Sequence, residues 1–230
     1  MADALPAPQH IELSPPDKPG PYANLYRFGI DSRVLRVVYV GGAVSRATYE
    51  ERRHTAPTMI AASFARARAR VTTAPVELLC CPCPLDTGEH GTEWILEHHQ
   101  DIESVLGSAE EIAAVGYSAG ASYATTLALF EDRARALAVF GAAGMAATID
   151  ELRPVIAQRR SPPLPCAAFS NTGDPVCAQG DAWARRHPEA LAATVRRAPG
   201  GHPFADYEAN GSVVAAFAFV LEHLCSTARR

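Results

Sequence analysis

The amino-acid sequence predicts a single α/β domain in which helices cover both faces of a mostly parallel central sheet. The 230 residues are enough for one such domain with a full hydrophobic core. Short apolar runs alternate along the chain with helix-like segments, as expected when each strand is followed by a crossover helix. We find no internal repeat and no second domain.

The N-terminal 21 residues differ from the rest of the chain. They hold six prolines and few large apolar side chains, so they can form neither a helix nor a central strand. We therefore expect residues 1–21 to be a proline-rich tail or surface arm, and residues 22–230 to be the folded domain.

The folded domain begins with two apolar runs, residues 23–30 and residues 34–40, which are separated by Asp31, Ser32 and Arg33. Two strands joined by so short a connection are typical of a hairpin. A hairpin here would place an antiparallel strand at the edge of the sheet.

Strands and helices continue to alternate after this pair. The expected strands are residues 75–81, 112–116, 136–140, 164–170 and 192–197. The expected helices are residues 57–70, 92–106, the stretch after Ser118, 179–186 and 213–224. Residues 144–163 are expected to be a helix-poor link.

The charge balance and hydropathy exclude several classes of partner. The chain has 21 basic and 25 acidic residues, a net charge of −4, which gives no field for attracting nucleic acid or an anionic membrane. No apolar run is long enough for a membrane span, and the N-terminus lacks a basic start followed by an apolar segment. We therefore expect a cytoplasmic protein with neither nucleic-acid nor membrane partners.

Three of the six cysteines lie together at the end of an apolar strand, at Cys80, Cys81 and Cys83. Cys80 and Cys83 have the C-x-x-C spacing, but no second pair with zinc-site spacing follows. We interpret them as buried or half-buried free thiols rather than as a redox or metal site. Because the chain also lacks His-Glu-x-x-His and the glycine-rich phosphate-binding motifs, we expect neither a metal nor a nucleotide cofactor.

Residues 116–120 read Gly-Tyr-Ser-Ala-Gly and directly follow the apolar run 112–116. A Gly-x-Ser-x-Gly sequence between a strand and a helix is typical of a nucleophile elbow, a sharp turn that exposes the serine hydroxyl. Ser118 is the candidate nucleophile. The alternative is that Ser118 only caps the following helix.

A candidate acid and a candidate base follow two later strands. Asp174 comes after residues 164–170, and His202 comes after residues 192–197. In such a sheet, catalytic groups lie on loops beyond the carboxyl ends of strands. The chain order of serine, acid and histidine is also the one expected for an elbow-type triad.

Other interpretations of these positions remain open. Asp174 could only form a turn before Pro175, and His202 could be an ordinary loop histidine. The rival acid is Asp181, and the rival histidines are His187 and His223.

With these motifs, the chain resembles the α/β-hydrolase superfamily from the second predicted strand to the last helix. The resembling segments are residues 116–120, Gly173-Asp174-Pro175-Val176 and Gly201-His202. The resemblance implies an α/β-hydrolase fold with little or no cap, because the usual place for a cap insertion spans only residues 144–163.

By the same resemblance, Gly42 or Ala43 would supply one backbone N–H of an oxyanion hole, and Ala119 would supply the other. Gly41-Gly42 could instead be a plain tight turn. Residues 86–91 only vaguely resemble a turn of this superfamily, and we assign them no function.

These features together predict a serine hydrolase that acts on carboxylic esters or thioesters through an acyl-enzyme on Ser118. The expected partner is a small acyl substrate, free or carried on a larger molecule. The apolar residues Leu152, Val155 and Ile156 either line one wall of the site or form an amphipathic helix on the sheet. The alternatives are a carrier-dependent thioesterase or acyltransferase of a biosynthetic pathway, and a non-hydrolytic or binding protein of the same fold.

Overall fold

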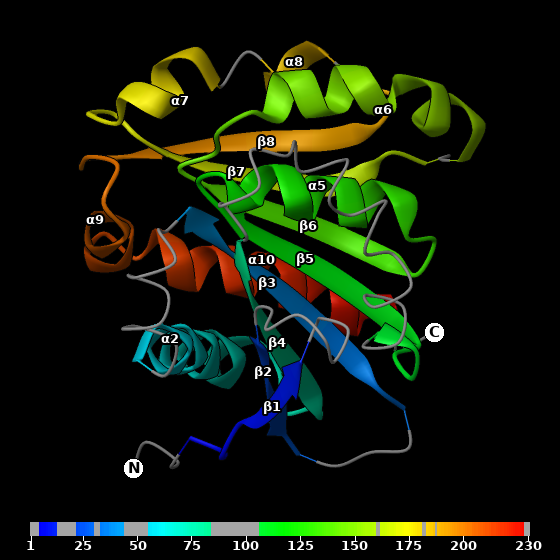
Figure 1. The fold of residues 1–230 in the computed structure, drawn as a ribbon, viewed down its shortest axis with the longest axis vertical. Coiled ribbons are helices and arrows are strands. Elements are labelled where there is room, and N and C mark those ends of the chain that lie inside the picture. Colours follow the sequence, from blue (N-terminus) through cyan, green and yellow to red (C-terminus); the bar gives the residue numbers. More distant parts are fainter. Residues whose placement is uncertain are drawn as a thin grey trace.

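A computed structural model describes the parts of the chain that build the core and the candidate site. In them the chain forms an eight-stranded, mostly parallel sheet with helices on both faces (Figure 1). The predicted fold class is thereby confirmed. The described residues are 5–12, 22–29, 33–43, 55–83, 106–159, 162–180, 183–186 and 188–227.

The strands lie across the sheet in the order β1-β2-β4-β3-β5-β6-β7-β8. β2 is antiparallel to β1 and β4, and every other neighbouring pair is parallel. The strands are β1 (Gln9–Glu12), β2 (Tyr22–Phe28), β3 (Leu35–Ala43), β4 (Val76–Cys83), β5 (Glu111–Tyr117), β6 (Ala134–Phe140), β7 (Leu164–Asn171) and β8 (Leu191–Ala198).

The helices pack into two hydrophobic cores, one on each face of the sheet (Figure 1). One core is covered by α5 (Gly120–Phe130), α6 (Met145–Arg159) and α8 (Trp183–Arg186). The other is covered by α2 (Thr55–Val71) and α10 (Ser212–Thr227), with α9 (Phe204–Ala209) beside them. The short helix α7 (Pro175–Gly180) follows β7.

Strand β5 shows why the central strands are apolar along their whole length. Ile112 and Ala114 point into the core under α5, whereas Ala113 and Val115 point into the core under α10. Successive side chains of a strand point to opposite faces, so a strand covered on both sides needs apolar residues at every position. All four of these side chains are fully buried.

The predicted hairpin of the first two strands is wrong, because β4 lies between β2 and β3. The three strands are joined at Glu77 of β4, which accepts hydrogen bonds of 2.9 Å from both Arg27 of β2 and Arg36 of β3. A short connection is compatible with either arrangement, since two strand spacings amount to only about 9–10 Å. The cross-strand partners, which are distant in sequence, therefore decide the order.

The N-terminal segment, expected to be a tail or arm, contributes the edge strand β1. Its residues Gln9–Glu12 pair with β2, and Gln9 Oε1 accepts a 2.7 Å hydrogen bond from Arg27. An edge position suits this proline-rich segment, because one side of an edge strand needs no backbone partner.

The expectation of a helix-poor link over residues 144–163 is wrong, because α6 occupies most of that range. Met145, Ile149 and Leu152 recur at helical spacing and are buried against the sheet and α5. Leu152 is thus part of an amphipathic helix that packs on the sheet, which is one of the two interpretations of its apolar side chain. The side chains of Val155 and Ile156 lie outside the described residues, as does the predicted helix 92–106 except for Leu106.

The cysteines whose side chains are described, Cys80, Cys81, Cys166, Cys177 and Cys225, are free thiols, and burial raises the pKa of Cys80. The side chain of Cys83 lies outside the described residues. The described residues contain no group of three or more His, Cys, Asp or Glu side chains arranged to hold a metal ion. Nor is any helix among them both long and apolar enough to cross a bilayer.

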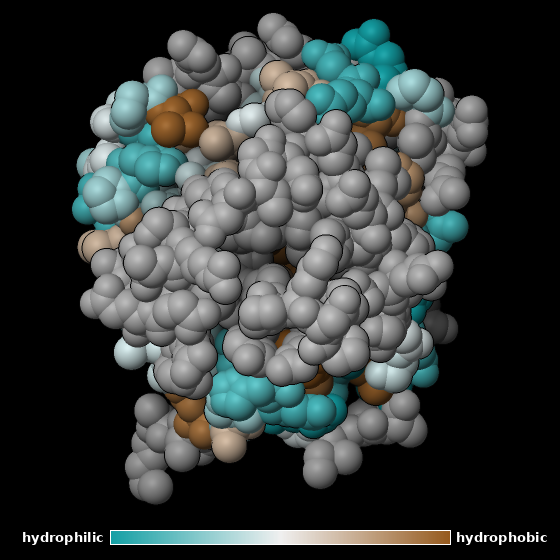
Figure 2. Space-filling model, in the orientation of Figure 1, coloured by the Kyte–Doolittle hydropathy of each residue, from teal (hydrophilic) through white to brown (hydrophobic). Residues whose placement is uncertain are grey.

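On the face shown in Figure 2, the described residues are mostly hydrophilic, with scattered hydrophobic ones. Met59 and Val195 are the described large apolar residues that are most exposed, at 46% and 37%. Most of the other large apolar side chains of the described residues are buried in the two cores.

Candidate active site

Ser118 lies on the turn between β5 and α5. Its φ of 53° makes it the one non-glycine residue with positive φ among those described. This conformation costs about 1–3 kcal/mol and is found where surrounding structure enforces it, often at functional sites. Ser118 N–H donates to Phe140 O and its carbonyl accepts from Ala121 and Ala143 N–H, which holds the turn from both sides.

The two glycines of the Gly-x-Ser-x-Gly sequence allow the strand and the helix to approach. A Cβ atom at Gly120 would lie 2.1 Å from the carbonyl oxygen of Gly41, and one at Gly116 would lie 2.6 Å from Ala121 Cα. Both distances are far below van der Waals contact with backbone atoms. The sequence pattern therefore reflects a steric requirement of the elbow.

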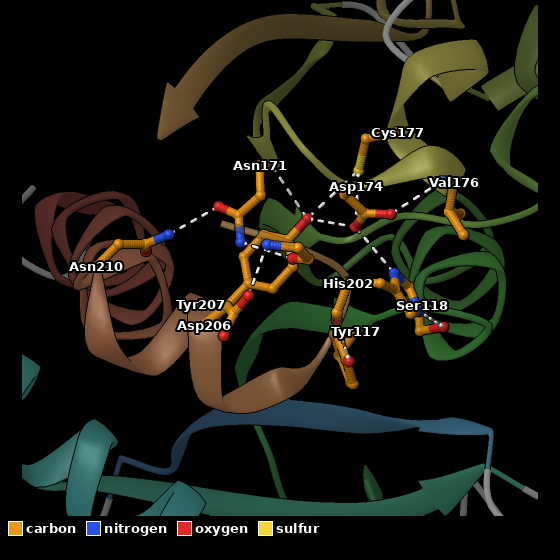
Figure 3. A network of polar contacts seen from close by, with 11 residues as sticks. Tyr117, Ser118, Asn171, Asp174, Val176, Cys177, His202, Asp206, Tyr207 and Asn210 are labelled. Atoms are coloured by element: carbon orange, nitrogen blue, oxygen red, sulfur yellow. Dashed lines mark hydrogen bonds and ion pairs between the residues drawn. The ribbon is translucent and has the colours of Figure 1, made fainter. Parts of the chain in front are cut away.

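The predicted serine, histidine and acid lie in one chain of hydrogen bonds (Figure 3). Ser118 Oγ is 3.0 Å from His202 Nε2, and His202 Nδ1 is 2.8 Å from Asp174 Oδ2. Asp174 follows β7 and His202 follows β8, at the carboxyl edge of the sheet where Ser118 also lies. The parallel strands thus bring together residues that are 28 to 84 positions apart.

Asp174 is buried, with 2% of its surface exposed, and both of its carboxylate oxygens accept hydrogen bonds. Val176 N–H donates to Oδ1 at 2.9 Å, and Tyr207 Oη donates to Oδ2 at 2.7 Å. Burial raises the pKa of Asp174, but the hydrogen bonds from Tyr207, His202 and Val176 outweigh it and hold the pKa below the ordinary value. The side chain is therefore an ionised acceptor for the His202 N–H at neutral pH.

The loop that carries His202 is fixed by polar groups on both sides. Gly201 N–H donates to Asp206 Oδ2 at 2.6 Å, and Gly201 O accepts from Asn171 Nδ2 at 2.9 Å. Asn210 Nδ2 in turn donates to Asn171 Oδ1 at 2.7 Å. His202 is thus tied both to the end of β7, which precedes Asp174, and to α9.

Tyr117, the residue before Ser118, also holds His202. Its hydroxyl donates to the backbone carbonyl of His202 at 2.7 Å, and its ring stacks on the imidazole with centroids 5.7 Å apart. Phe140 in turn stacks on the Tyr117 ring, with centroids 5.1 Å apart. Burial, followed by the charges of Asp174 and Asp206, raises the pKa of Tyr117 to about 12, so its hydroxyl keeps its proton.

Two of the three candidate oxyanion residues lie directly beside Ser118. A Cβ atom at Gly42 would be 3.2 Å from Ser118 Cβ, so the end of β3 packs against the elbow. Ala119 is the N-cap of α5, and its N–H has no hydrogen-bond partner within the described part of the chain. Ala43 is the next residue after Gly42 and the last of β3, where the pairing with β4 shifts register.

Of the rival residues, the structure describes only His223, and its polar contact is not with Ser118. His223 lies in α10, where its Nδ1 is 2.9 Å from Phe219 O and its ring contacts the Phe219 ring. Asp181, His187 and residues 86–91 lie outside the described residues.

Sequence reasoning missed the supporting residues Tyr207, Asn171 and Asp206. Tyr207 lies in α9, a six-residue helix that the apolar pattern did not predict. Nothing in its local sequence distinguishes it from an ordinary core tyrosine, because its role depends on contact with a residue 33 positions away.

No protein-family model matches the sequence, and no curated protein matches it significantly. Solved structures do match over most of the chain. A hyperthermophilic esterase from the archaeon Pyrobaculum calidifontis aligns with a TM-score of 0.61 and 14% identity, over 93% of this chain and 86% of the esterase. Est1E from Butyrivibrio proteoclasticus aligns with a TM-score of 0.60 and 14% identity, over 95% and 99%.

An S-formylglutathione hydrolase from Agrobacterium tumefaciens aligns with a TM-score of 0.56 and 13% identity, over 89% of this chain and 90% of that protein. At such low identity the likeness shows the fold alone. The chain has the α/β-hydrolase fold, as the resemblance of its motifs implied.

Proposed function

We propose that this protein is a serine hydrolase that cleaves carboxylic esters or thioesters through an acyl-enzyme on Ser118. The observation that carries the proposal is the continuous hydrogen-bond chain from Ser118 through His202 to Asp174. A serine hydroxyl is a weak nucleophile without an adjacent base, and this chain supplies both a base and a group that orients it.

In the first step, Ser118 Oγ attacks the substrate carbonyl while His202 Nε2, at 3.0 Å, takes the hydroxyl proton. Asp174 holds the other ring nitrogen and stabilises the imidazolium that forms. His202 then gives its proton to the leaving alcohol or thiol, and the carbon–oxygen or carbon–sulfur bond breaks.

In the second step, a water molecule gives its proton to His202 and attacks the acyl-enzyme carbonyl. His202 returns that proton to Ser118 Oγ as the carboxylic acid leaves. The same histidine therefore acts alternately as base and acid, which requires that it stay in one orientation. The hydrogen bonds around Gly201 and the contacts of Tyr117 support that orientation.

The oxyanion formed in each step needs N–H donors beside Ser118. Ala119 N–H at the start of α5 is one proposed donor, and Gly42 or Ala43 supplies the other. A helix N-terminus favours negative charge, and removal of one such donor costs about 3–4 kcal/mol of transition-state stabilisation in comparable sites.

The packing of α6 supports a site with little cap. The described apolar side chains of this helix, Met145, Ile149 and Leu152, are buried in the core with α5 rather than raised above the carboxyl edge. An uncapped site suits esters or thioesters of modest size, or an acyl group presented on a larger carrier.

The first experiment is intact-mass analysis after treatment with a fluorophosphonate probe. We expect one adduct on the wild type and none on Ser118→Ala or His202→Ala. Ser122→Ala is the matched control, because Ser122 lies one turn further along α5, where its Oγ is bonded to Ala143 O. An unmodified wild type, or an adduct that survives Ser118→Ala, would overturn the proposal.

If the adduct forms as expected, turnover of matched ester and thioester substrates separates the two bond types. A series of acyl chain lengths then defines the substrate. Adding an alcohol or amine acceptor tests acyl transfer: a transferase forms the new ester or amide in preference to the free acid.

A further inference from the structure

Tyr207 is the most completely buried polar group that contacts the proposed acid. The residue is 0% exposed, and its hydroxyl lies 2.7 Å from Asp174 Oδ2, the same oxygen that receives the His202 N–H (Figure 3). Nothing in the mechanism above uses this hydroxyl. Its position nevertheless makes it a third partner of the acid–base pair.

The direction of this hydrogen bond follows from the donors available. A phenol has one proton to donate. The backbone N–H of Asn171 donates to the Tyr207 oxygen at 3.2 Å, so that oxygen already acts as an acceptor. Its own proton is therefore free for the carboxylate, which can only accept when it is ionised. Cys177 Sγ, at 3.4 Å from both groups, is a weaker and longer contact.

The tyrosine ring has little freedom to move. It contacts Phe140 with centroids 5.6 Å apart and Tyr117 at 6.1 Å. A Cβ atom at Gly141, where φ is 55°, would lie 3.2 Å from Tyr207 Cε2, so the ring fits closely over that glycine. A rigid ring holds its hydroxyl at a fixed point, and the bound carboxylate oxygen is fixed with it.

We propose that Tyr207 is a positioning residue for the acid–base pair, which orients the Asp174 carboxylate and limits how tightly the pair binds a proton. This inference rests on the proposed function. The Tyr207 hydroxyl and the His202 N–H share Asp174 Oδ2. The tyrosine hydroxyl therefore withdraws electron density from the oxygen that stabilises the imidazolium. Burial raises the pKa of Tyr207 itself, so the hydroxyl remains a donor throughout the working pH range.

The test compares Tyr207→Phe with Tyr39→Phe. Tyr39 is also a buried tyrosine that stacks on Phe140, but it is not among the partners of Asp174. Without the Tyr207 hydroxyl, the Asp174–His202 pair binds a proton more tightly. In the pH profile of kcat/KM, we expect the midpoint of the low-pH limb to move to higher pH by about one pH unit. We also expect kcat at neutral pH to fall about tenfold with little change in KM. Tyr39→Phe should leave both unchanged.

The concentration of active enzyme is measured for each variant by titration with the fluorophosphonate probe, so that partial unfolding is not mistaken for a loss of catalytic rate. A purely structural role for Tyr207 would lower thermal stability and leave the limb where it is in the wild type, and that result overturns the proposal. If Tyr207→Phe does not fold, 3-fluorotyrosine at position 207 gives the opposite test. Its more acidic phenol donates more strongly, so the limb should move to lower pH, and an unmoved limb again overturns the proposal.

Failure of this inference is distinct from failure of the proposed function. If Ser118→Ala keeps its turnover, the serine mechanism itself is wrong. If Ser118→Ala is inactive but Tyr207→Phe behaves like Tyr39→Phe, the mechanism stands and only the role of Tyr207 is refuted.

Discussion

Two adjacent glycines, Gly41 and Gly42, allow a direct test of the packing between β3 and the elbow. A Cβ atom at Gly42 would lie 2.8 Å from Tyr117 Cδ1 and 3.2 Å from Ser118 Cβ. Among the described residues, a Cβ atom at Gly41 would meet nothing nearer than Cys81 O at 3.7 Å, an ordinary contact. Neither glycine has positive φ, so Ala at either position differs mainly in what its methyl group touches.

Ordinary contact begins near 3.4 Å, so Gly42→Ala requires a displacement of about 0.6 Å. The Tyr117 ring cannot easily supply it, because the ring stacks on Phe140 and its hydroxyl holds His202 O at 2.7 Å. The displacement therefore passes to Ser118 or to the proposed oxyanion loop. A misplacement of about 1 Å at a reacting group can cost about a hundredfold in rate.

We expect Gly42→Ala to lower kcat by about 10- to 100-fold, equivalent to about 1.4–2.7 kcal/mol of transition-state stabilisation. Gly41→Ala should stay within twofold of the wild type. The measurement is the rate of fluorophosphonate labelling together with ester turnover, with thermal unfolding of both variants as a control. If both variants react at the same rate, close packing of Gly42 against Ser118 is refuted.

Four further predictions follow from the site and the core. Asp174→Asn should lower kcat by about four orders of magnitude, and a loss below tenfold in single-turnover measurements would assign the acid role to another residue. The pKa of Asp174 is lower in the folded protein than its value of about 3.8 in the unfolded chain, so ionised Asp174 stabilises the fold. This stabilisation is fully present above the unfolded pKa and is lost as pH falls through the folded pKa. The gap in unfolding free energy between wild type and Asp174→Asn should therefore narrow in urea titrations at progressively lower pH, and a constant gap would contradict this. Gly120→Ala should cost more than about 4 kcal/mol or prevent folding, since its Cβ would lie 2.1 Å from Gly41 O; a melting temperature near that of the wild type would refute the steric argument. Leu152→Ala should cost about 2–5 kcal/mol in urea unfolding with unchanged probe labelling, whereas slower labelling would place Leu152 in the site.

The three proposed catalytic positions could be predicted from the sequence because each carries a local signal. Ser118 lies in a pattern that a strand, a tight turn and a helix require, and the contacts of Gly116 and Gly120 show the steric origin of that pattern. Asp174 and His202 could be selected because each follows an apolar strand, and carboxyl ends of parallel strands meet at one edge. Their catalytic roles themselves await the experiments above.

The order of the first strands could not be predicted in the same way. Residues 22–43 contain two strands with a short connection, and this local pattern is the same for a hairpin as for a pair separated by a third strand. The decision lies with Glu77, which bonds Arg27 on one side and Arg36 on the other. Arg27 is 50 positions and Arg36 is 41 positions from Glu77 in the sequence.

The sequence by itself thus determined the fold class, the elbow and the approximate places of the proposed acid and base, because strand and helix periodicity and turn sterics act over a few residues. Only the tertiary structure decided the strand order, the helix over Met145–Arg159 and the contacts of Tyr207. Tyr207 is a core tyrosine by its local pattern and becomes a partner of Asp174 only when α9 packs beside β7. Such a contact depends on the relative placement of distant elements, which no short stretch of sequence specifies.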